Sequence, residues 1–264
     1  MEVQLRMAVV RKFAHPRGWA FSIAPVLVKP VLVTIGRRDW RHGERIPAHG
    51  GAIIAINHIS KIDPLMLAHL LYNHGRLPRF LAKDGLFRIK VLGWFLRAAG
   101  QIPVVRAGDD AASAFAAAVA AVRDGECVIF YPEGSITRDP DGWPMRGKTG
   151  AARVALAADA PVIPIGQWGA QNTLPAYSGK LSVLPRHVAH YNVGNPVELD
   201  DLRGKEITTE VLHEATDRIM AAITELVAEI RDLEPPTERF DPRREGLSEI
   251  GKIVQVESRV SEEA

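Results

Sequence analysis

The stretch "AIIAINHISKIDPLMLAHLLYNH", residues 52–74, contains the change from strand to helix on which the fold depends. Its first part, residues 52–57, is an apolar run of strand length, and apolar residues recur at helical spacing after Asp63. A polar loop that carries His58 separates the two parts. A buried strand, a loop and a helix in this order are typical of a layered α/β domain.

The same alternation continues along the chain. Apolar runs of strand length lie at residues 127–132, 161–166 and 187–194, and helical patterns lie at 109–125, 148–159 and about 209–233. We therefore expect an α/β fold in which one layered domain holds a mixed, mostly parallel sheet flanked by helices. Asp109 or Asp110 is expected to cap the alanine-rich helix that follows it.

Composition divides the chain into three segments. Residues 1–45 are expected to form an N-terminal interfacial helical segment, and residues 46–233 the main domain. Residues 234–264 are polar and rich in acidic side chains, so we expect a tail that is flexible or packed peripherally.

The N-terminal segment contains a strongly apolar run at residues 19–36. Pro25, Lys29 and Pro30 interrupt it, and we expect the interruption to come before a membrane-spanning length is reached. The prediction is an N-terminal apolar segment that lies in a membrane interface. A helix buried against the main domain is the alternative.

Charge is distributed unevenly along the chain. Residues 1–197 hold 24 Lys and Arg against 13 Asp and Glu, whereas residues 198–264 hold 9 against 18. A basic body beside an apolar, Trp-containing N-terminus favours an anionic membrane surface as a partner, with an ordinary solvated basic surface as the alternative. The chain has no basic stripe with interleaved aromatic residues and no zinc or helix-turn-helix pattern, so no nucleic acid partner is expected.

Cysteine content and the N-terminus bear on the cellular compartment. The single cysteine, Cys127, lies in an apolar run, which excludes a disulfide framework or a cysteine metal site. No clean secretory signal is evident, which favours the cytoplasm.

His58 and Asp63 form the first candidate pair. On a regular helix, side chains five residues apart do not share a face, so the two meet only if His58 lies in the loop before the helix. Asp63 resembles a helix N-cap and Pro64 a first helical residue, which permits that geometry. An imidazole oriented by a carboxylate is the usual general base for a hydroxyl group, although a cap and a loop histidine without chemistry remain the alternative.

A polar turn follows the strand at 127–132. Glu133, Gly134, Ser135 and Arg138 place a carboxylate, a flexible backbone, a hydroxyl and a cation at the end of a strand. Ligands of open α/β sheets bind at strand ends, so these four are candidate substrate-binding residues. An ordinary polar turn is the alternative.

Cations supply a candidate phosphate site. Arg106 ends the short apolar run "GQIPVVR", residues 100–106, and a guanidinium at a strand end suits a phosphate. Lys83 is a second candidate phosphate-binding residue. The alternative for each residue alone is a solvated side chain on the protein surface.

Four blocks in a fixed order decide between these alternatives. They are "NHISKID" (57–63), "GQIPVVR" (100–106), "YPEGS" (131–135) and "VIPIG" (162–166). Together they resemble the glycerolipid acyltransferase family, in particular its PlsC-type 1-acylglycerol-3-phosphate acyltransferases, over about residues 50–170. Each block is weak by itself, whereas the ordered set is specific.

The resemblance implies a role for each matched residue. His58 is expected to be the general base that deprotonates a glycerol hydroxyl, and Asp63 to orient it. Glu133 and Gly134 are expected to hold the glycerophosphate portion of the acceptor, with Arg106 on its phosphate. The acyl donor is expected to be a thioester of coenzyme A or acyl carrier protein, so neither a metal nor a cofactor is required.

This chain departs from the family pattern in two places. Ile136 and Thr137 separate Ser135 from Arg138, where many members have Arg directly after Thr. Val105 precedes the arginine of the second block, where an acidic or amide residue is common. Both departures concern the acceptor.

The prediction is a peripheral O-acyltransferase at the cytoplasmic face of the cell membrane, which converts lysophosphatidic acid to phosphatidic acid. The same chemistry on a glycolipid or another lysophospholipid, and a non-catalytic lipid-binding member, are the alternatives.

Overall fold

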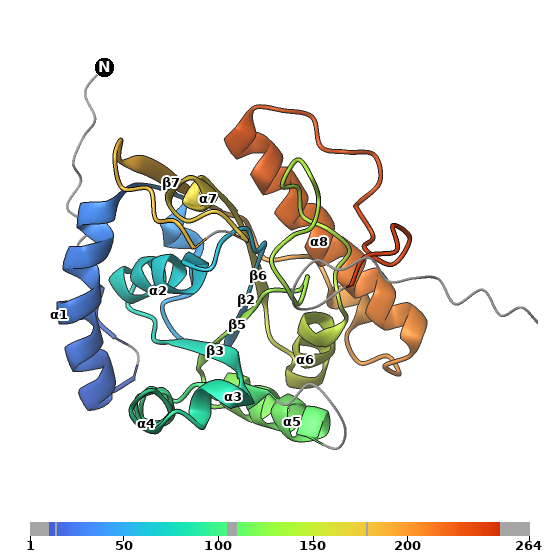
Figure 1. The fold of residues 1–264 in the computed structure, drawn as a ribbon. Coiled ribbons are helices and arrows are strands. Elements are labelled where there is room, and N and C mark those ends of the chain that lie inside the picture. Colours follow the sequence, from blue (N-terminus) through green and yellow to red (C-terminus); the bar gives the residue numbers. More distant parts are fainter. Residues whose placement is uncertain (1–10, 14, 105–109, 178, 249–264) are drawn as a thin grey trace, which may run out of the picture.

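A seven-stranded sheet runs through the molecule, and helices cover both of its faces in the computed structural model (Figure 1). The structure describes residues 11–13, 15–104, 110–177 and 179–248. The strands are β1 (Gly36–Arg41), β2 (Ala52–Ile56), β3 (Pro78–Lys83), β4 (Ile102–Val104), β5 (Cys127–Phe130), β6 (Val162–Trp168) and β7 (His187–Val193). The α-helices are α1 (Gly18–Ile35), α2 (Asp63–Asn73), α3 (Asp84–Phe87), α4 (Lys90–Ala98), α5 (Asp110–Arg123), α6 (Gly150–Ala158), α7 (Ala170–Thr173) and α8 (Thr209–Arg231), with 3₁₀ turns η1 (Gly43–Arg45) and η2 (Asp200–Leu202).

Strand pairing confirms the predicted mixed, mostly parallel sheet. The order is β1-β7-β6-β2-β5-β3-β4. Strands β6, β2, β5, β3 and β4 are parallel neighbours, while β7 runs antiparallel to β6 and pairs in parallel with β1. The carboxyl ends of the five parallel strands therefore meet at one edge, where α/β proteins bind ligands.

The two faces of β2 explain why its sequence is continuously apolar. Ile53 and Ala55 pack into a core with α5, α6 and α8, whereas Ile54 and Ile56 pack into a second core with α2. All four side chains are fully buried. Successive side chains of a strand point to opposite faces, so a strand covered on both sides has no polar face.

The start of α2 differs from the prediction by one residue. Asp63 is the first helical residue and Ile62 the N-cap, with Pro64 in the first turn. No side chain caps the first turn of this helix. The Asp63 carboxylate instead turns back toward the preceding loop, where it accepts several hydrogen bonds, so the prediction that it caps its own helix is wrong.

The expected interruption of the N-terminal apolar run is absent, because α1 continues through Pro25 and Pro30. A proline removes one backbone donor, but the turns on either side stay bonded and the helix persists. Among the described residues, α1 is the one helix long and apolar enough to cross a membrane by length and composition. Only Ala20 and Leu32 of this helix are buried, so α1 is not a core helix of the domain.

The boundaries of the predicted segments also need correction. The N-terminal helix ends at Ile35, and the next six residues form β1, which pairs with β7 inside the sheet. In the acidic tail, the described residues up to 248 pack peripherally, since Arg146 bonds the carbonyl of Phe240 and the carboxylate of Asp241. Residues 249–264 and Asp109 lie outside the described residues, as does the side chain of Asp110.

Candidate active site

His58 and Asp63 meet at the carboxyl edge of the parallel strands. His58 follows β2 in the loop that leads to α2, and its Nδ1 lies 2.9 Å from Oδ2 of Asp63. The imidazole is 18% exposed and the carboxylate is fully buried. Because a carboxylate only accepts hydrogen bonds, this contact places the ring proton on Nδ1 and leaves Nε2 as the basic nitrogen.

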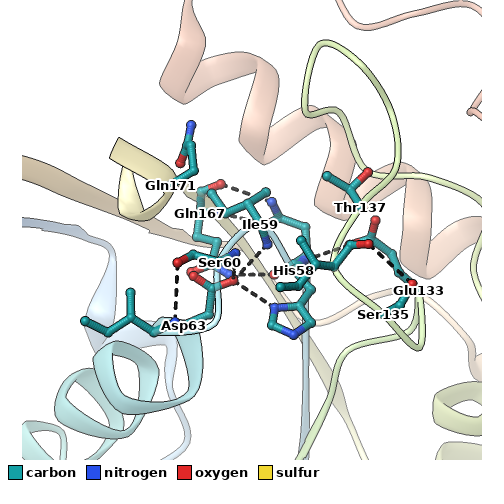
Figure 2. Close-up of polar contacts among 12 residues, drawn as sticks. His58, Ile59, Ser60, Asp63, Glu133, Ser135, Thr137, Gln167 and Gln171 are labelled. Atoms are coloured by element: carbon teal, nitrogen blue, oxygen red, sulfur yellow. Dashed lines mark hydrogen bonds and ion pairs between the residues drawn. The ribbon is translucent and has the colours of Figure 1, made fainter. Parts of the chain in front are cut away.

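The loop before α2 is wrapped around the Asp63 carboxylate, as Figure 2 shows. Oδ2 also accepts the backbone N–H groups of Ile59 and Ser60, each at 2.8 Å. The start of a helix adds its own favourable field for an anion. One buried oxygen therefore fixes both the loop and the tautomer of the imidazole.

Glu133 holds the backbone of His58 from the other side. Its Oε1 accepts the N–H of His58 at 2.7 Å, and its Oε2 accepts the N–H of Met145 at 3.0 Å. Burial raises the pKa of Glu133 to about 8, although the backbone hydrogen bonds from Met145 and His58 act in the opposite direction. Both oxygens thus accept backbone N–H groups inside the protein, which is a scaffold contact, and the contact of Glu133 with the acceptor stays a prediction.

Gly134 is required by its backbone conformation. Its φ is +74°, in the left-handed region, and a Cβ would lie 3.1 Å from Cδ and Cε of Lys148. Its N–H closes the turn on the carbonyl of Tyr131 at 2.9 Å. A side chain here would strain the turn and collide with the lysine stem.

The remaining predicted residues occupy different environments. Ser135 is partly exposed, and its Oγ lies 3.3 Å from the carbonyl oxygen of Ile136. Arg138, a candidate substrate-binding residue, is only 5% exposed. Lys83 is exposed at the carboxyl end of β3, paired with Val104 of β4.

Two further predictions concern Arg106 and the absence of a metal. Arg106 lies outside the described residues, two positions beyond the end of β4. For a metal, no group of three or more His, Cys, Asp or Glu side chains comes together in residues 11–13, 15–104, 110–177 and 179–248.

A buried amide pair that the sequence reasoning missed joins the strands beneath the site. Gln167 N donates to Oδ1 of Asn57 at 2.8 Å, Nε2 of Gln167 donates to the carbonyl of Asn57 at 2.6 Å, and Nδ2 of Asn57 donates to the carbonyl of Gln167 at 3.1 Å. Both residues are fully buried. Asn57 lies immediately before His58 inside the first sequence block, and this position is the signal that could have identified it.

Thr137 is a second support that the sequence reasoning missed. Its N–H donates to the carbonyl of His58 at 2.7 Å, and its hydroxyl donates to the carbonyl of Trp143 at 2.7 Å. Figure 2 shows that Thr137 and Glu133 approach His58 from the turn after β5, while Asp63 approaches from α2. The main chain of His58 is thus held at both its N–H and its carbonyl.

Comparison with known proteins agrees with the four sequence blocks. A family model described as Acyltransferase matches residues 38–168. A chloroplastic 1-acyl-sn-glycerol-3-phosphate acyltransferase of Brassica napus is 31% identical over 170 residues, 64% of this chain and 46% of the relative. The 1-acyl-sn-glycerol-3-phosphate acyltransferase of Borreliella burgdorferi is 32% identical over 130 residues, 49% of this chain and 50% of the relative. This chain therefore spans about half the length of these relatives.

A third relative has a different acceptor in its name. The lyso-ornithine lipid O-acyltransferase of Rhodobacter capsulatus is 31% identical over 121 residues, 46% of this chain and 41% of the relative. The crystal structure of the 1-acyl-sn-glycerophosphate acyltransferase PlsC of Thermotoga maritima shares the fold, with a TM-score of 0.61, 21% identity and 81% of each chain covered. The match over residues 38–168, together with these relatives, shows that the chain contains a domain of the acyltransferase family.

Proposed function

We propose that the protein is an O-acyltransferase that moves a fatty acyl chain from an acyl thioester to a hydroxyl of lysophosphatidic acid, giving phosphatidic acid. The observation that carries this proposal is the His58–Asp63 pair, with Nδ1 held at 2.9 Å from a buried carboxylate and the ring partly exposed. The names of the Brassica and Borreliella relatives support the same acceptor.

The proposed reaction needs one base and two correctly placed substrates. Nε2 of His58 takes the proton of the acceptor hydroxyl as its oxygen attacks the thioester carbonyl. The tetrahedral intermediate then expels the thiolate of coenzyme A or acyl carrier protein, which takes up the proton from the imidazolium. Asp63 stabilises the imidazolium in between, and general-base catalysis of this kind contributes about 10²–10⁴ in rate.

No metal or cofactor is required by this chemistry, because the thioester is already activated. Orientation of the two bound substrates supplies much of the remaining rate enhancement. For the acceptor phosphate we propose Lys83 and Arg106. Lys83 is the last residue of β3, and Arg106 follows β4 in the sequence; the two strands are paired, and their carboxyl ends belong to the carboxyl edge of the sheet. Ser135 lies on the turn after β5 at the same edge, next to a glycine that lets a ligand approach the backbone.

An exposed apolar face supports a peripheral position at an anionic membrane. The face consists of Trp19, Ile23, Val26, Leu27 and Val31 on α1, and Leu86, Ile89, Val91, Leu92 and Trp94 on α3, α4 and their connection. The rings of Trp19 and Trp94 stack with centroids 4.1 Å apart and join its two halves. The exposed cations Arg88 and Lys90 lie within it, which suits anionic lipid headgroups.

The attachment of α1 favours a helix that lies along the interface. Its last residue, Ile35, is followed directly by β1, so that end of the helix is fixed to the sheet. Figure 1 shows α1 alongside the domain, with its N-terminal end beside α4. Because thioester donors are made in the cytoplasm, we propose the cytoplasmic face of the cell membrane.

A second candidate acceptor follows from one of the relatives. The name of the lyso-ornithine lipid O-acyltransferase gives an acceptor that is not named as a phosphate. The departures of this chain from the family pattern, around Val105 and Arg138, also concern the acceptor. Another polar lysolipid is therefore the alternative within the same chemistry.

The test is an acyl-transfer assay with the purified full-length protein. Radiolabelled palmitoyl-CoA is offered with lysophosphatidic acid, lyso-ornithine lipid or lysophosphatidylcholine, with His58→Ala as the control. We expect labelled phosphatidic acid with one equivalent of coenzyme A released, and no product from the control. Transfer only to lyso-ornithine lipid would select the second acceptor, and hydrolysis to free palmitate alone would contradict both.

A further inference from the structure

Two tyrosines with buried hydroxyl groups lie near the His58–Asp63 pair, and Tyr131 itself is partly buried. Tyr131 follows β5 directly, and Tyr191 lies within β7 and is 1% exposed. Both hydroxyl groups are buried, and neither makes a hydrogen bond with any described residue. Oδ1 of Asp63, the carboxylate oxygen that does not face His58, is likewise buried and receives no hydrogen bond from the described part of the chain.

Packing brings the two tyrosines together, because Tyr191 belongs to the core on the α2 side of the sheet and Tyr131 packs against that core. Burial raises the pKa of Tyr131 well above its ordinary value, and the charge of Asp63 followed by Tyr191 raises it further. The pKa of Tyr191 is raised by burial first and then by the charge of Asp63. Both phenols therefore keep their protons, and a phenol can donate where a carboxylate can only accept.

Tyr131 also contacts the imidazole itself. The ring centroids of His58 and Tyr131 are 4.3 Å apart, with 31° between the ring planes. A ring packed at this distance restricts rotation of the imidazole about its Cβ–Cγ bond. The base is thus held at Nδ1 by Asp63 and on one face by Tyr131.

We propose that Tyr131 and Tyr191 are positioning residues for the general base. Tyr131 limits the orientation of the imidazole through the tilted contact of the two rings, and the two hydroxyl groups serve Oδ1 of Asp63 through one shared water. Oδ2 is then free to hold Nδ1 and the loop amides. The proposal rests on the proposed role of His58, and it assigns a task to three buried polar groups that the mechanism otherwise leaves unused.

The charges around His58 determine the expected direction of the effect. The Asp63 carboxylate bonds the imidazole, the Glu133 carboxylate bonds the main-chain N–H of His58, and the ring of Tyr131 contacts the imidazole. A hydroxyl that donates to Asp63 weakens the attraction between its carboxylate and the imidazolium. Removing that hydroxyl should therefore displace the acid limb of kcat/KM toward higher pH.

The experiment compares Tyr191→Phe, Tyr131→Phe and Tyr131→Leu in the full-length protein. The control is Tyr72→Phe, which removes the hydroxyl of a buried tyrosine that bonds Arg17 at the far end of α2. We expect both active-site phenylalanine variants to lower kcat about tenfold at unchanged KM and to move the acid limb upward. Tyr131→Leu should lower kcat further because the ring contact is lost too, while Tyr72→Phe should match wild type.

A second readout does not depend on turnover. The ¹⁵N signals of His58, assigned by comparison with His58→Asn, report the ring tautomer in the free enzyme. We expect a single Nδ1–H tautomer in wild type and tautomer exchange in Tyr131→Leu. If all three variants keep the kcat, the pH profile and the ¹⁵N signals of wild type, the positioning role is overturned. If the wild-type protein shows no acyl transfer while Tyr131→Leu still shows tautomer exchange, only the proposed function is contradicted.

Discussion

The carboxylate of Glu133 accepts the main-chain N–H of His58 at 2.7 Å, so a buried acid 75 residues downstream fixes the backbone of the candidate base. Thr137, from the same turn, donates its own N–H to the carbonyl of His58 at 2.7 Å. The turn after β5 therefore acts on the histidine through its main chain, and the helix start at Asp63 acts through its side chain.

The stability of the protein should depend on the protonation of Glu133. Its pKa is raised from 4.5 to about 8 by burial, so between these values the folded state binds more protons than the unfolded state. The free energy of unfolding should therefore fall as pH rises through this window, by an amount on the order of 5 kcal/mol from this group.

The matched control for that dependence is Glu133→Gln, which does not titrate. Its amide N–H₂ faces one of the two backbone donors and costs about 1–3 kcal/mol at every pH. In urea denaturation, the stability advantage of wild type over this variant should shrink from pH 5 to pH 8. An advantage that stays constant across this range would show that Glu133 is ionised in the fold throughout.

Replacing Asp63 with asparagine should separate the charge of this side chain from its hydrogen bonds. An amide oxygen at the position of Oδ2 can still accept Nδ1–H of His58 and the N–H groups of Ile59 and Ser60, but it carries no negative charge to stabilise the imidazolium. We expect kcat to fall by about 10³–10⁴, as loss of the orienting carboxylate does in comparable triads. Acyl-transfer kinetics and circular dichroism measure the two effects; a folded variant with wild-type kcat would exclude the pair as catalytic.

Asn57→Ala should destabilise the fold from within the site. The change leaves the N–H of Gln167 buried without its partner and costs about 1–3 kcal/mol. The exposed Asn195→Ala is the control and should stay within about 0.5 kcal/mol of wild type. Guanidinium unfolding of the two variants compares them directly, and equal midpoints would mean that the amide pair is not a tie between the strands.

Polar substitution on the exposed apolar face should weaken membrane binding. The double variant Val26→Asn and Val91→Asn replaces side chains that are 70% and 78% exposed, one on each half of the face. Each loses apolar contact with lipid, and together they should lower partitioning onto vesicles of phosphatidylglycerol by about tenfold. Leu233→Asn, beyond the end of α8, should bind like wild type. Unchanged vesicle sedimentation of the double variant would place the membrane contact elsewhere.

Arg106→Ala should reveal the acceptor. If the guanidinium binds the acceptor phosphate, the KM for lysophosphatidic acid should rise by about 10–100-fold while the KM for palmitoyl-CoA stays the same. Arg146→Ala, which loses an ion pair with Asp241 in the tail, is the control cation. An unchanged acceptor KM would remove Arg106 from the phosphate site.

How far the fold could be predicted depended on how each strand is covered. Strands β2, β5 and β6 are buried on both faces and show as continuous apolar runs. Strand β1 is an edge strand with Arg37, Arg38, Asp39 and Arg41, and its charged sequence has no strand pattern because one side lacks a neighbour. The sequence pattern therefore predicts a helical segment over residues 1–45 and does not indicate this strand.

The site divides in the same way between local and distant contacts. The His58–Asp63 contact could be predicted because five residues and a helix start determine it. The scaffold role of Glu133 could not, since a carboxylate in a polar turn has the same sequence signature whether it faces a ligand or a backbone N–H. Only the packing of β5 beside β2 determines which donors come within its reach.

The separation of these contacts along the chain has a consequence for how the protein reaches its folded state. The histidine and its aspartate are neighbours in sequence, but Asn57 meets Gln167 across 110 residues and His58 meets Glu133 across 75. Contacts of such sequence separation form late compared with helices. A newly made chain should therefore acquire its helices before its base is in place, and catalytic competence should be among the last properties to return on refolding.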